Sequence, residues 1–342
     1  MATIPSSQYG FFYNSKVGLK LKEDLPVAKL LPGQVLLKVE AAGLCHSDLH
    51  IIYEGLDCGD NYVMGHEIAG TIADALPGVD GQFSNLKVGD RVACFGANGC
   101  GNCEFCRTGK DNDCVNAYAN WFGLGSDGGY QQYLLVRNPR NLVPIPENVE
   151  FAEAAAITDA VLTPYHAIRL ANVTPVTKLL IIGAGGLGTN AIQLACAFGA
   201  DVTVLDKKQK ALDIAKKLDP QITAYTELPN DLPVAIFDVI LDLVGIQATF
   251  DLAQKYVKSK GIIVPVGLGS PNLNFDLASL ALREINIYGS FWGTSQDLAE
   301  CFALAAQGKV KPQVHTVSLK ELPTYIEKLR NGQYEGRVVL IP

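Results

Sequence analysis

The sequence has no basic segment that could follow a nucleic-acid backbone. Its 28 Lys and Arg residues are outnumbered by 35 Asp and Glu residues, which gives a net charge of -7. Proteins that bind nucleic acids neutralise phosphates with clustered Lys and Arg. The charge pattern therefore argues against DNA or RNA as a partner.

A targeting segment is also missing from the N-terminal residues. MATIPSSQYGFFYNSK contains no secretory apolar core, and the first arginine is Arg91. The uncharged run 179–200 is long enough for a transmembrane helix, but its glycines and its Thr189, Asn190 and Gln193 argue against one. We expect a cytoplasmic protein with no membrane partner, in which nine cysteines serve as metal ligands or buried thiols.

The 342 residues are enough for two domains. Residues 1–152 contain short β-like runs broken by Gly, Pro and Asn, such as QVLLKVEAAG, HEIAGTIADA and GDRVACFG. In 153–291, apolar runs alternate with helical patterns, which predicts an α/β domain with a doubly wound parallel sheet. Residues 292–342 supply one helix and one last strand, which we expect to return to the first domain.

A glycine motif opens the second domain. LLIIGAGGLG places Gly183, Gly185 and Gly188 after an apolar strand and at the start of a helix, so the uncharged run is a strand and a buried helix. Asp206 ends the next strand, where a ribose-binding acid is expected. An acid there favours NAD over NADP, although Lys207 and Lys208 follow it and weaken that preference. Further candidate cofactor contacts are Gly186, Leu187 and Lys207.

Four cysteines are crowded into the segment CGNCEFCRTGKDNDC. Cys100, Cys103, Cys106 and Cys114 have the spacing of a closed tetrahedral zinc site that stabilises a lobe at about 96–116. A redox CxxC pair is the main alternative, but it accounts for only two of the four thiols.

Two further motifs carry groups able to bind metal or move protons. GLCHSDLH offers Cys45, His46, Ser47, Asp48 and His50, and GHE offers His66 and Glu67. The apolar run AAITDAVLTPYHA holds a lone carboxylate, Asp159, and a buried carboxylate needs a partner. A helix N-cap is the simple alternative for Asp159.

These motifs, in this order with the terminal EGRVVL, resemble the zinc-dependent medium-chain alcohol dehydrogenases, and most closely the yeast secondary alcohol dehydrogenase and carbonyl reductase branch. The resemblance implies a GroES-like catalytic domain and a Rossmann domain. It implies a catalytic zinc on Cys45, His66 and Asp159, with Glu67 adjacent. Many family members have Cys at the third position, and an Asp is typical of the branch that reduces ketones.

The resemblance also implies roles for residues near that zinc. Ser47 begins a proton relay that ends at His50, which exchanges the proton with solvent, as imidazoles commonly do. His46 and Arg337 face the pyrophosphate, and Asp48 supports His66. A solvated surface charge is the alternative for His46 and Arg337. The remaining implied contacts are Thr163 beside the nicotinamide and Leu56, Trp121, Leu268 and Trp292 in the substrate pocket, although a Trp is more often core.

The expected function is therefore NAD(H)-dependent interconversion of alcohols, secondary alcohols above all, with ketones or aldehydes. The cofactors are NAD(H) and two zinc ions per subunit, and the assembly is a homodimer or homotetramer. A polyol dehydrogenase of the same family and a non-catalytic cofactor-binding protein on this fold are the alternatives. A zinc-free quinone reductase would lack Cys45, His66 and the cysteine lobe.

Overall fold

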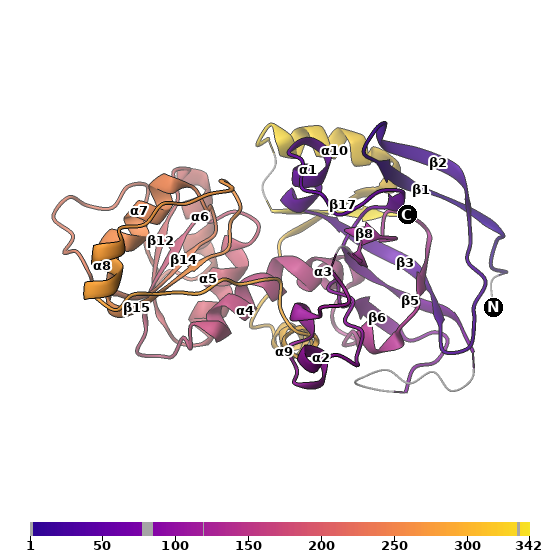
Figure 1. Cartoon of the computed structure of the whole chain (residues 1–342), viewed down its shortest axis with the longest axis horizontal. Coiled ribbons are helices and arrows are strands. Elements are labelled where there is room, and N and C mark those ends of the chain that lie inside the picture. The colour runs from indigo at the N-terminus through magenta and orange to yellow at the C-terminus, as the bar shows by residue number, and fades with distance from the viewer. Residues whose placement is uncertain (1–2, 77–84, 119, 334–335) are drawn as a thin grey trace. The chain divides into compact units, whose positions relative to one another are not determined.

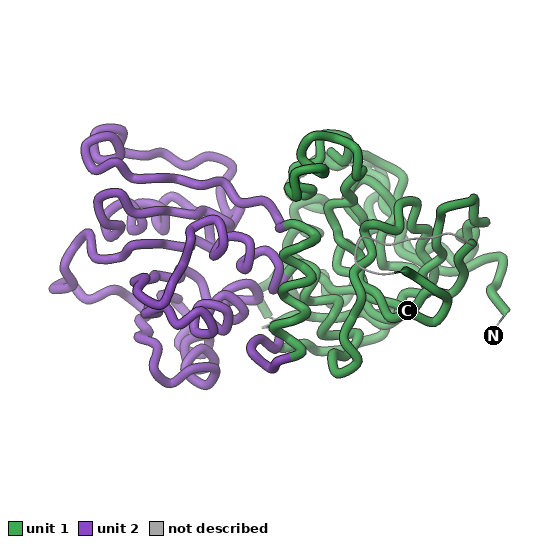
Figure 2. The backbone as a smooth tube through the Cα atoms, turned by 90° about the horizontal axis from the view of Figure 1, so that it is seen from below, with its two compact units in different colours: residues 1–159, 294–306, 312–342 green, residues 160–293, 307–311 purple. Residues whose placement is uncertain are grey.

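The computed structural model describes residues 3–76, 85–118, 120–333 and 336–342. Figure 2 shows the chain divided into two compact units. Unit 1 comprises residues 1–159, 294–306 and 312–342, and unit 2 comprises residues 160–293 and 307–311.

The first segment of unit 1 extends past residue 152, where the boundary was expected. Helix α3 (Phe151–Ala156) packs on strands β3 (Val35–Leu44) and β5 (Glu67–Ala75), and its last three residues, Ala154, Ala155 and Ala156, are fully buried. The chain therefore stays with unit 1 until Asp159.

The short return of 307–311 to unit 2 was not expected either. The Gln193 side chain accepts a hydrogen bond from the Lys311 backbone N–H at 2.9 Å and donates one to the Lys311 carbonyl at 3.2 Å. This pair ties the segment to helix α5 (Gly188–Ala197) of unit 2.

Unit 1 is built mainly from strands, as the N-terminal pattern predicts (Figure 1). Its main sheet has the order β10-β6-β5-β3-β18-β17, with β9 also paired to β3. A second sheet has the order β2-β1-β4, and β7 pairs with β8. The strands not yet given are β1 (Ser7–Asn14), β2 (Gly18–Pro26), β4 (Tyr62–Val63), β6 (Arg91–Cys94), β7 (Trp121–Phe122), β8 (Gly125–Ser126), β9 (Tyr133–Val136) and β10 (Leu142–Pro144).

The C-terminal part of unit 1 has more structure than the sequence predicted. It holds α9 (Ser295–Ala306), β17 (Val314–Ser318), α10 (Leu322–Arg330) and β18 (Arg337–Ile341). The expectation of one helix and one strand was wrong on both counts, because α9 is a second helix. Strand β17 was missed because it is an exposed edge strand whose sequence VHTVS lacks the apolar alternation of a half-buried strand.

Unit 2 has a parallel sheet in the order β13-β12-β11-β14-β15-β16, which is the 3-2-1-4-5-6 order of a Rossmann fold. Helix α5 packs on β11 and β12, and α7 packs on β14 and β15. The strands are β11 (Lys178–Ile182), β12 (Asp201–Leu205), β13 (Thr223–Tyr225), β14 (Phe237–Asp242), β15 (Val257–Pro265) and β16 (Asn286–Ile287). The other helices are α4 (Leu162–Leu170), α6 (Gln209–Leu218), α7 (Gln247–Tyr256) and α8 (Leu277–Leu282) in unit 2, and α1 (His46–Tyr53) and α2 (Glu104–Arg107) in unit 1.

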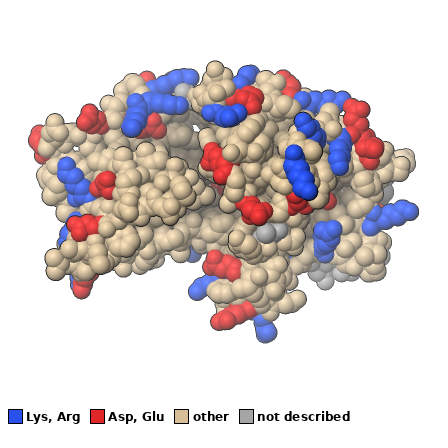
Figure 3. Space-filling model, turned by 45° about the horizontal axis from the view of Figure 1, so that its top comes forward, with Lys and Arg blue, Asp and Glu red and all other residues tan. Residues whose placement is uncertain are grey.

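The uncharged run 179–200 forms β11 and the buried helix α5, as predicted. Within the described residues, no helix has the length and apolar character needed to cross a membrane. On the face drawn in Figure 3, Lys and Arg are interspersed with Asp and Glu instead of forming a basic track.

Candidate active site

Four side chains able to bind metal meet inside unit 1. Ligand atoms of Cys45, His66, Glu67 and Asp159 all lie within 4.8 Å of one another, and all four residues are buried. Asp159 Oδ2 is 3.2 Å from Cys45 Sγ and 4.0 Å from His66 Nε2. The lone carboxylate of the apolar run therefore lies beside the two residues that the family resemblance implies as its neighbours.

Antiparallel pairing of β3 with β5 brings two of these segments together. Gly43 pairs with Glu67, so Cys45, just after β3, comes near His66, just before β5. A Cβ on Gly43 would lie 1.8 Å from Glu67 Oε2. Glycine at 43 thus makes room for the Glu67 carboxylate.

Asp159 lies in a π-helical turn, η3 (Ile157–Val161), between α3 and α4. Such turns insert an extra residue into an α-helix and are frequent at functional sites. The N-cap alternative for Asp159 is wrong, because helical residues precede it and the N-cap position of α4 is Val161.

Arg337 is a buried partner of two carboxylates. Its Nη2 lies 3.2 Å from Glu67 Oε1 and 3.3 Å from Asp159 Oδ2, and Nη1 donates to the Leu44 carbonyl at 3.2 Å. The residue is 6% exposed, so the surface-charge alternative is wrong for Arg337. Burial lowers the pKa of Arg337, but Glu67, Cys45 and Asp159 outweigh it and raise the pKa. The predicted contact with a pyrophosphate stays a prediction.

Asp48 connects the two ligand segments. Its Oδ2 accepts the Cys45 backbone N–H at 2.9 Å and the Tyr130 hydroxyl at 2.9 Å, and its Oδ1 lies 3.6 Å from His66 Nδ1. Asp48 is fully buried. The expected support of His66 by Asp48 is consistent with this geometry, whereas Tyr130 had no motif that could identify it from the sequence.

The relay residues lie on α1. The Cys45 thiol donates to Ser47 Oγ at 3.7 Å, and His50 Nδ1 lies 2.5 Å from Glu54 Oε2, one helical turn later. No hydrogen bond joins Ser47 to His50 among the described residues. His46 is exposed, and partial desolvation together with the Arg337 charge lowers its pKa. Glu54 was missed, although its i+4 spacing from His50 is a sequence signal.

The buried cluster suits a zinc ion. A thiolate, an imidazole and a carboxylate are all zinc ligands, and three protein ligands are typical of catalytic sites. Burial raises the pKa of Glu67 well above its usual range, and the Arg337 charge opposes this. Neither Glu67 oxygen accepts a hydrogen bond among the described atoms. The Arg337 guanidinium pairs with Oε1, so Oε2 is the oxygen that can face a metal ion.

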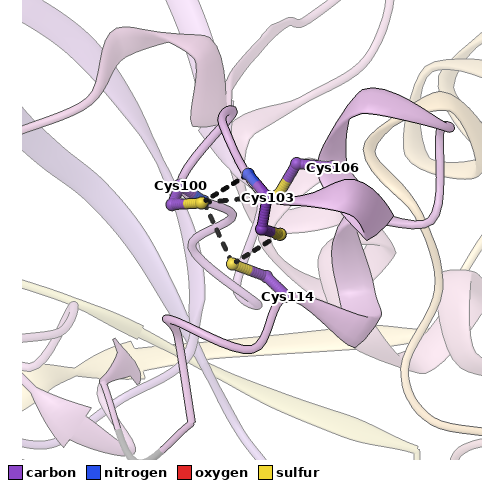
Figure 4. Close-up of side chains that lie close together, drawn as sticks. All are labelled: Cys100, Cys103, Cys106 and Cys114. Carbon is purple, nitrogen blue, oxygen red and sulfur yellow. Dashed lines mark hydrogen bonds between the residues drawn. The ribbon is translucent and has the colours of Figure 1, made fainter.

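The four lobe cysteines converge in a second cluster (Figure 4). Sulfurs of Cys100 and Cys106 are 4.0 Å apart, and those of Cys103 and Cys114 are 3.8 Å apart. Four sulfurs at about 2.3 Å from one tetrahedral ion would be roughly 3.8 Å apart. The spacing therefore fits a structural zinc and uses all four thiols, which a redox pair does not.

Hydrogen bonds prepare Cys100 for a metal. The Asn116 amide, the Asn102 N–H and the Cys103 N–H donate to its sulfur at 3.3, 3.4 and 3.4 Å. These donors lower the pKa of Cys100 to about 6, which favours the thiolate. Asn102 and Asn116 belong to no recognisable motif, so they were not identified from the sequence.

In unit 2, the glycine motif connects β11 to α5. Gly183 has φ +96°, and a Cβ on Gly188 would lie 2.0 Å from the Gly183 carbonyl oxygen. A Cβ on Gly185 would meet no protein atom within 4 Å, so its backbone is open to a ligand. Gly186 and Leu187 complete the turn before α5.

Asp206 is fixed at the end of β12. Its Oδ2 accepts from Ala184 N at 2.7 Å and its Oδ1 accepts from Lys208 N at 2.8 Å. The acid thus lies beside the glycine turn with lone pairs left for a diol, and the exposed Lys207 follows it. These features fit a dinucleotide.

The remaining predicted contacts are divided between the units. Leu56 is 43% exposed and Trp121 is partly buried in unit 1, while Leu268 is 64% exposed in unit 2. Thr163 and Trp292 are buried in unit 2. Their contacts with nicotinamide or substrate stay predictions.

The chain matches two protein families. The family described as Alcohol dehydrogenase GroES-like domain matches residues 31–147, and the family described as Zinc-binding dehydrogenase matches residues 186–307. An NAD-dependent alcohol dehydrogenase of Sulfurisphaera tokodaii is 35% identical over 96% of this chain and 98% of its own. An alcohol dehydrogenase of Geobacillus stearothermophilus is 34% identical, with 95% and 96% covered.

Solved structures agree with this likeness. Acetophenone reductase from Geotrichum candidum, in complex with NAD, is 46% identical with a TM-score of 0.92, and the match covers 100% of this chain and 99% of that one. The alcohol dehydrogenase of the archaeon Aeropyrum pernix is 30% identical with a TM-score of 0.85, with 98% and 100% covered.

Proposed function

The chain belongs to the zinc-binding alcohol dehydrogenase family, and we propose that it acts preferentially on secondary alcohols and ketones. It interconverts alcohols with ketones or aldehydes and uses NAD(H). The observation that carries the proposed preference is Asp159, which meets Cys45 and His66. By the family resemblance, many members have Cys at this position. The likeness to a reductase of acetophenone, a ketone, supports it.

In this proposal Cys45, His66 and Asp159 hold a catalytic zinc, and Cys100, Cys103, Cys106 and Cys114 hold a structural one. Zinc supplies a Lewis acid for the substrate oxygen, and NAD(H) accepts or supplies the hydride. The glycine turn and Asp206 bind the dinucleotide.

The chain's own groups then move the proton. During alcohol oxidation Ser47 Oγ would take the proton of the substrate hydroxyl and give up its own. Because no hydrogen bond joins Ser47 to His50 among the described residues, a bound hydroxyl or water would carry that proton to His50, which would exchange it with solvent. Glu54 accepts from His50 Nδ1, which leaves Nε2 as the basic atom that receives the proton. Asp48 and Arg337 hold the ligand carboxylates and imidazole in place.

The test is a kinetic panel with metal analysis. We expect two zinc ions per chain, a higher kcat/KM for acetophenone than for acetaldehyde, and NADH preferred over NADPH. Ser47→Ala should lower kcat by about 100-fold or more, while Ser126→Ala, which removes a hydroxyl that donates to the Asn120 and Trp121 backbone carbonyls, should not. A preference for acetaldehyde would contradict the ketone assignment.

The same panel separates the alternatives. A polyol dehydrogenase would oxidise sugar alcohols with higher kcat/KM than simple secondary alcohols. A non-catalytic protein would bind zinc and NADH and show no turnover with any carbonyl.

A homodimer or homotetramer is part of the proposal. Strand β16 is the edge of the parallel sheet, and nearby apolar side chains are exposed, with Phe275 at 52%, Leu277 at 66% and Leu282 at 86%. An edge strand beside apolar surface is a common site of pairing between subunits. Light scattering of the native chain and of Leu282→Glu tests it, since a monomeric native chain would contradict it.

We propose a cytoplasmic location because the cysteines are free thiols. All nine cysteines are free, and eight of them are buried or joined in the two metal-binding groups. Thiolate metal sites are typical of reducing compartments. Fractionation of cells that express the tagged chain tests this location.

A further inference from the structure

A buried tyrosine lies behind the catalytic cluster. Tyr130 is 0% exposed and is among the largest fully buried side chains of the described residues. Its hydroxyl is 2.9 Å from Asp48 Oδ2 and 3.0 Å from the Gly43 carbonyl. It has one proton and two acceptors within reach. The charged carboxylate is the stronger acceptor, because hydrogen bonds to ionised groups are about twice as strong as neutral ones.

Tyr130 also supports the segment that carries His66. The Tyr130 N–H donates to the Met64 carbonyl at 2.9 Å, and Gly129 N–H donates to the Gly65 carbonyl at 2.7 Å. Gly65 has φ +98°, and a Cβ there would lie 2.5 Å from the Tyr130 ring. The ring therefore packs on the backbone immediately before the ligand His66.

The contacts of Tyr130 reach both ligand segments through Asp48. Asp48 Oδ2 receives the Tyr130 hydroxyl and the Cys45 N–H, while Oδ1 faces His66 Nδ1 at 3.6 Å. Since Oδ2 is held by two donors, Oδ1 is fixed in the direction of the imidazole. Groups that orient a ligand imidazole strengthen metal binding.

From these contacts we propose that Tyr130 is a positioning residue of the catalytic metal site, whose hydroxyl fixes Asp48 and thereby the orientation of His66. The proposal rests on the assignment of zinc to Cys45, His66 and Asp159. Burial also raises the pKa of Tyr130 well above its usual range, so the hydroxyl stays a donor across the working pH.

Tyr130→Phe tests the proposal in the zinc-loaded enzyme. We expect the catalytic zinc to be released to a chelator on the order of tenfold faster than from the native chain, while the zinc of the cysteine lobe is released at the native rate. After cobalt replaces the catalytic zinc, the visible absorption bands should shift in the variant, because the His66 ligand is no longer fixed.

Tyr13→Phe is the matched control. Tyr13 is a buried tyrosine of the same unit whose hydroxyl donates to the Ile51 carbonyl and not to a carboxylate. Its removal should leave zinc release and the cobalt bands unchanged. The proposal would be overturned if Tyr130→Phe released the catalytic zinc at a rate within twofold of the native rate. It would also be overturned if Tyr13→Phe accelerated the release as much as Tyr130→Phe does.

A third variant separates the donor from the packing. Replacement of Tyr130 by 4-aminophenylalanine keeps a donor on the ring and should restore slow zinc release, including when Tyr130→Phe does not fold. Rapid release from a folded 4-aminophenylalanine protein would contradict the proposal. A native chain that holds no zinc outside the cysteine lobe would refute the proposed function itself, which is a different result.

Discussion

The Arg337 guanidinium and the Asp159 carboxylate form a buried ion pair, with Nη2 3.3 Å from Oδ2. They are far apart in sequence, on β18 and in the π-helical turn. The same Arg337 nitrogen lies 3.2 Å from Glu67 Oε1. The site thus contains a fixed positive charge beside the ligands proposed for zinc, which lowers the net negative charge of this buried cluster.

Loss of this cation should destabilise unit 1. Arg337→Gln removes the buried guanidinium that Glu67 and Asp159 share, and breaking a buried pair costs about 3 to 5 kcal/mol. Urea denaturation of the zinc-loaded chain measures the change. Arg330→Gln, at a side chain 53% exposed, is the control and should cost less than about 1 kcal/mol. Equal small effects of both variants would show that Arg337 is not needed for charge balance.

Removal of the Asp159 carboxylate should remove one metal. Asp159→Ala is expected to lower the zinc content from two ions per chain to one, because only Cys45 and His66 of the three ligands remain. Asp159→Cys should keep two, since a thiolate is also a zinc ligand. Asp113→Ala, at an exposed acid in the cysteine lobe, is the control. If Asp159→Ala retains two zinc ions, Asp159 is not a zinc ligand.

A substitution in the cysteine lobe should remove the other zinc ion. Cys103→Ser is expected to lose the structural zinc and keep the catalytic one, because the two clusters share no residue. Structural zinc contributes directly to folding free energy. The variant should therefore unfold at a lower temperature yet keep measurable turnover when assayed cold. Calorimetry with metal analysis checks this, and an unchanged melting temperature would argue against a structural metal.

Two glycines of one turn should respond differently to the same added methyl group. Gly185→Ala meets no protein atom, so its melting temperature should match the native one while its KM for NADH rises about tenfold or more. Gly188→Ala places Cβ 2.0 Å from the Gly183 carbonyl oxygen and should lower the melting temperature. If Gly185→Ala leaves the KM unchanged, the cofactor does not approach this backbone.

Asp206 should determine the choice of cofactor. Asp206→Ala removes the acceptor for a ribose hydroxyl and the charge that repels a 2'-phosphate. The ratio of kcat/KM for NADH to that for NADPH should fall at least about tenfold. Lys207→Ala is the neighbouring control and should leave the ratio above one. An unchanged ratio in Asp206→Ala would assign discrimination to other residues.

Local patterns predicted much of the fold. The β11 strand, the glycine turn, α5 and the acid of β12 follow one another within a short segment, so spacing alone could identify them. The four lobe cysteines are close in sequence for the same reason. The edge strand β17 and the return of 307–311 were missed, because neither has an apolar pattern that separates it from a loop.

The sequence by itself determined which chemical groups the protein has: thiols at metal-ligand spacing, a glycine turn before a helix and one carboxylate in an apolar run. Only the tertiary structure decided which of these groups meet. Pairing of β3 with β5 and with β18 brings Cys45, His66 and Arg337 to one place, and the π-helical turn adds Asp159. Such contacts join residues far apart in the chain, and their distances depend on strand register and side-chain packing, which no local pattern contains.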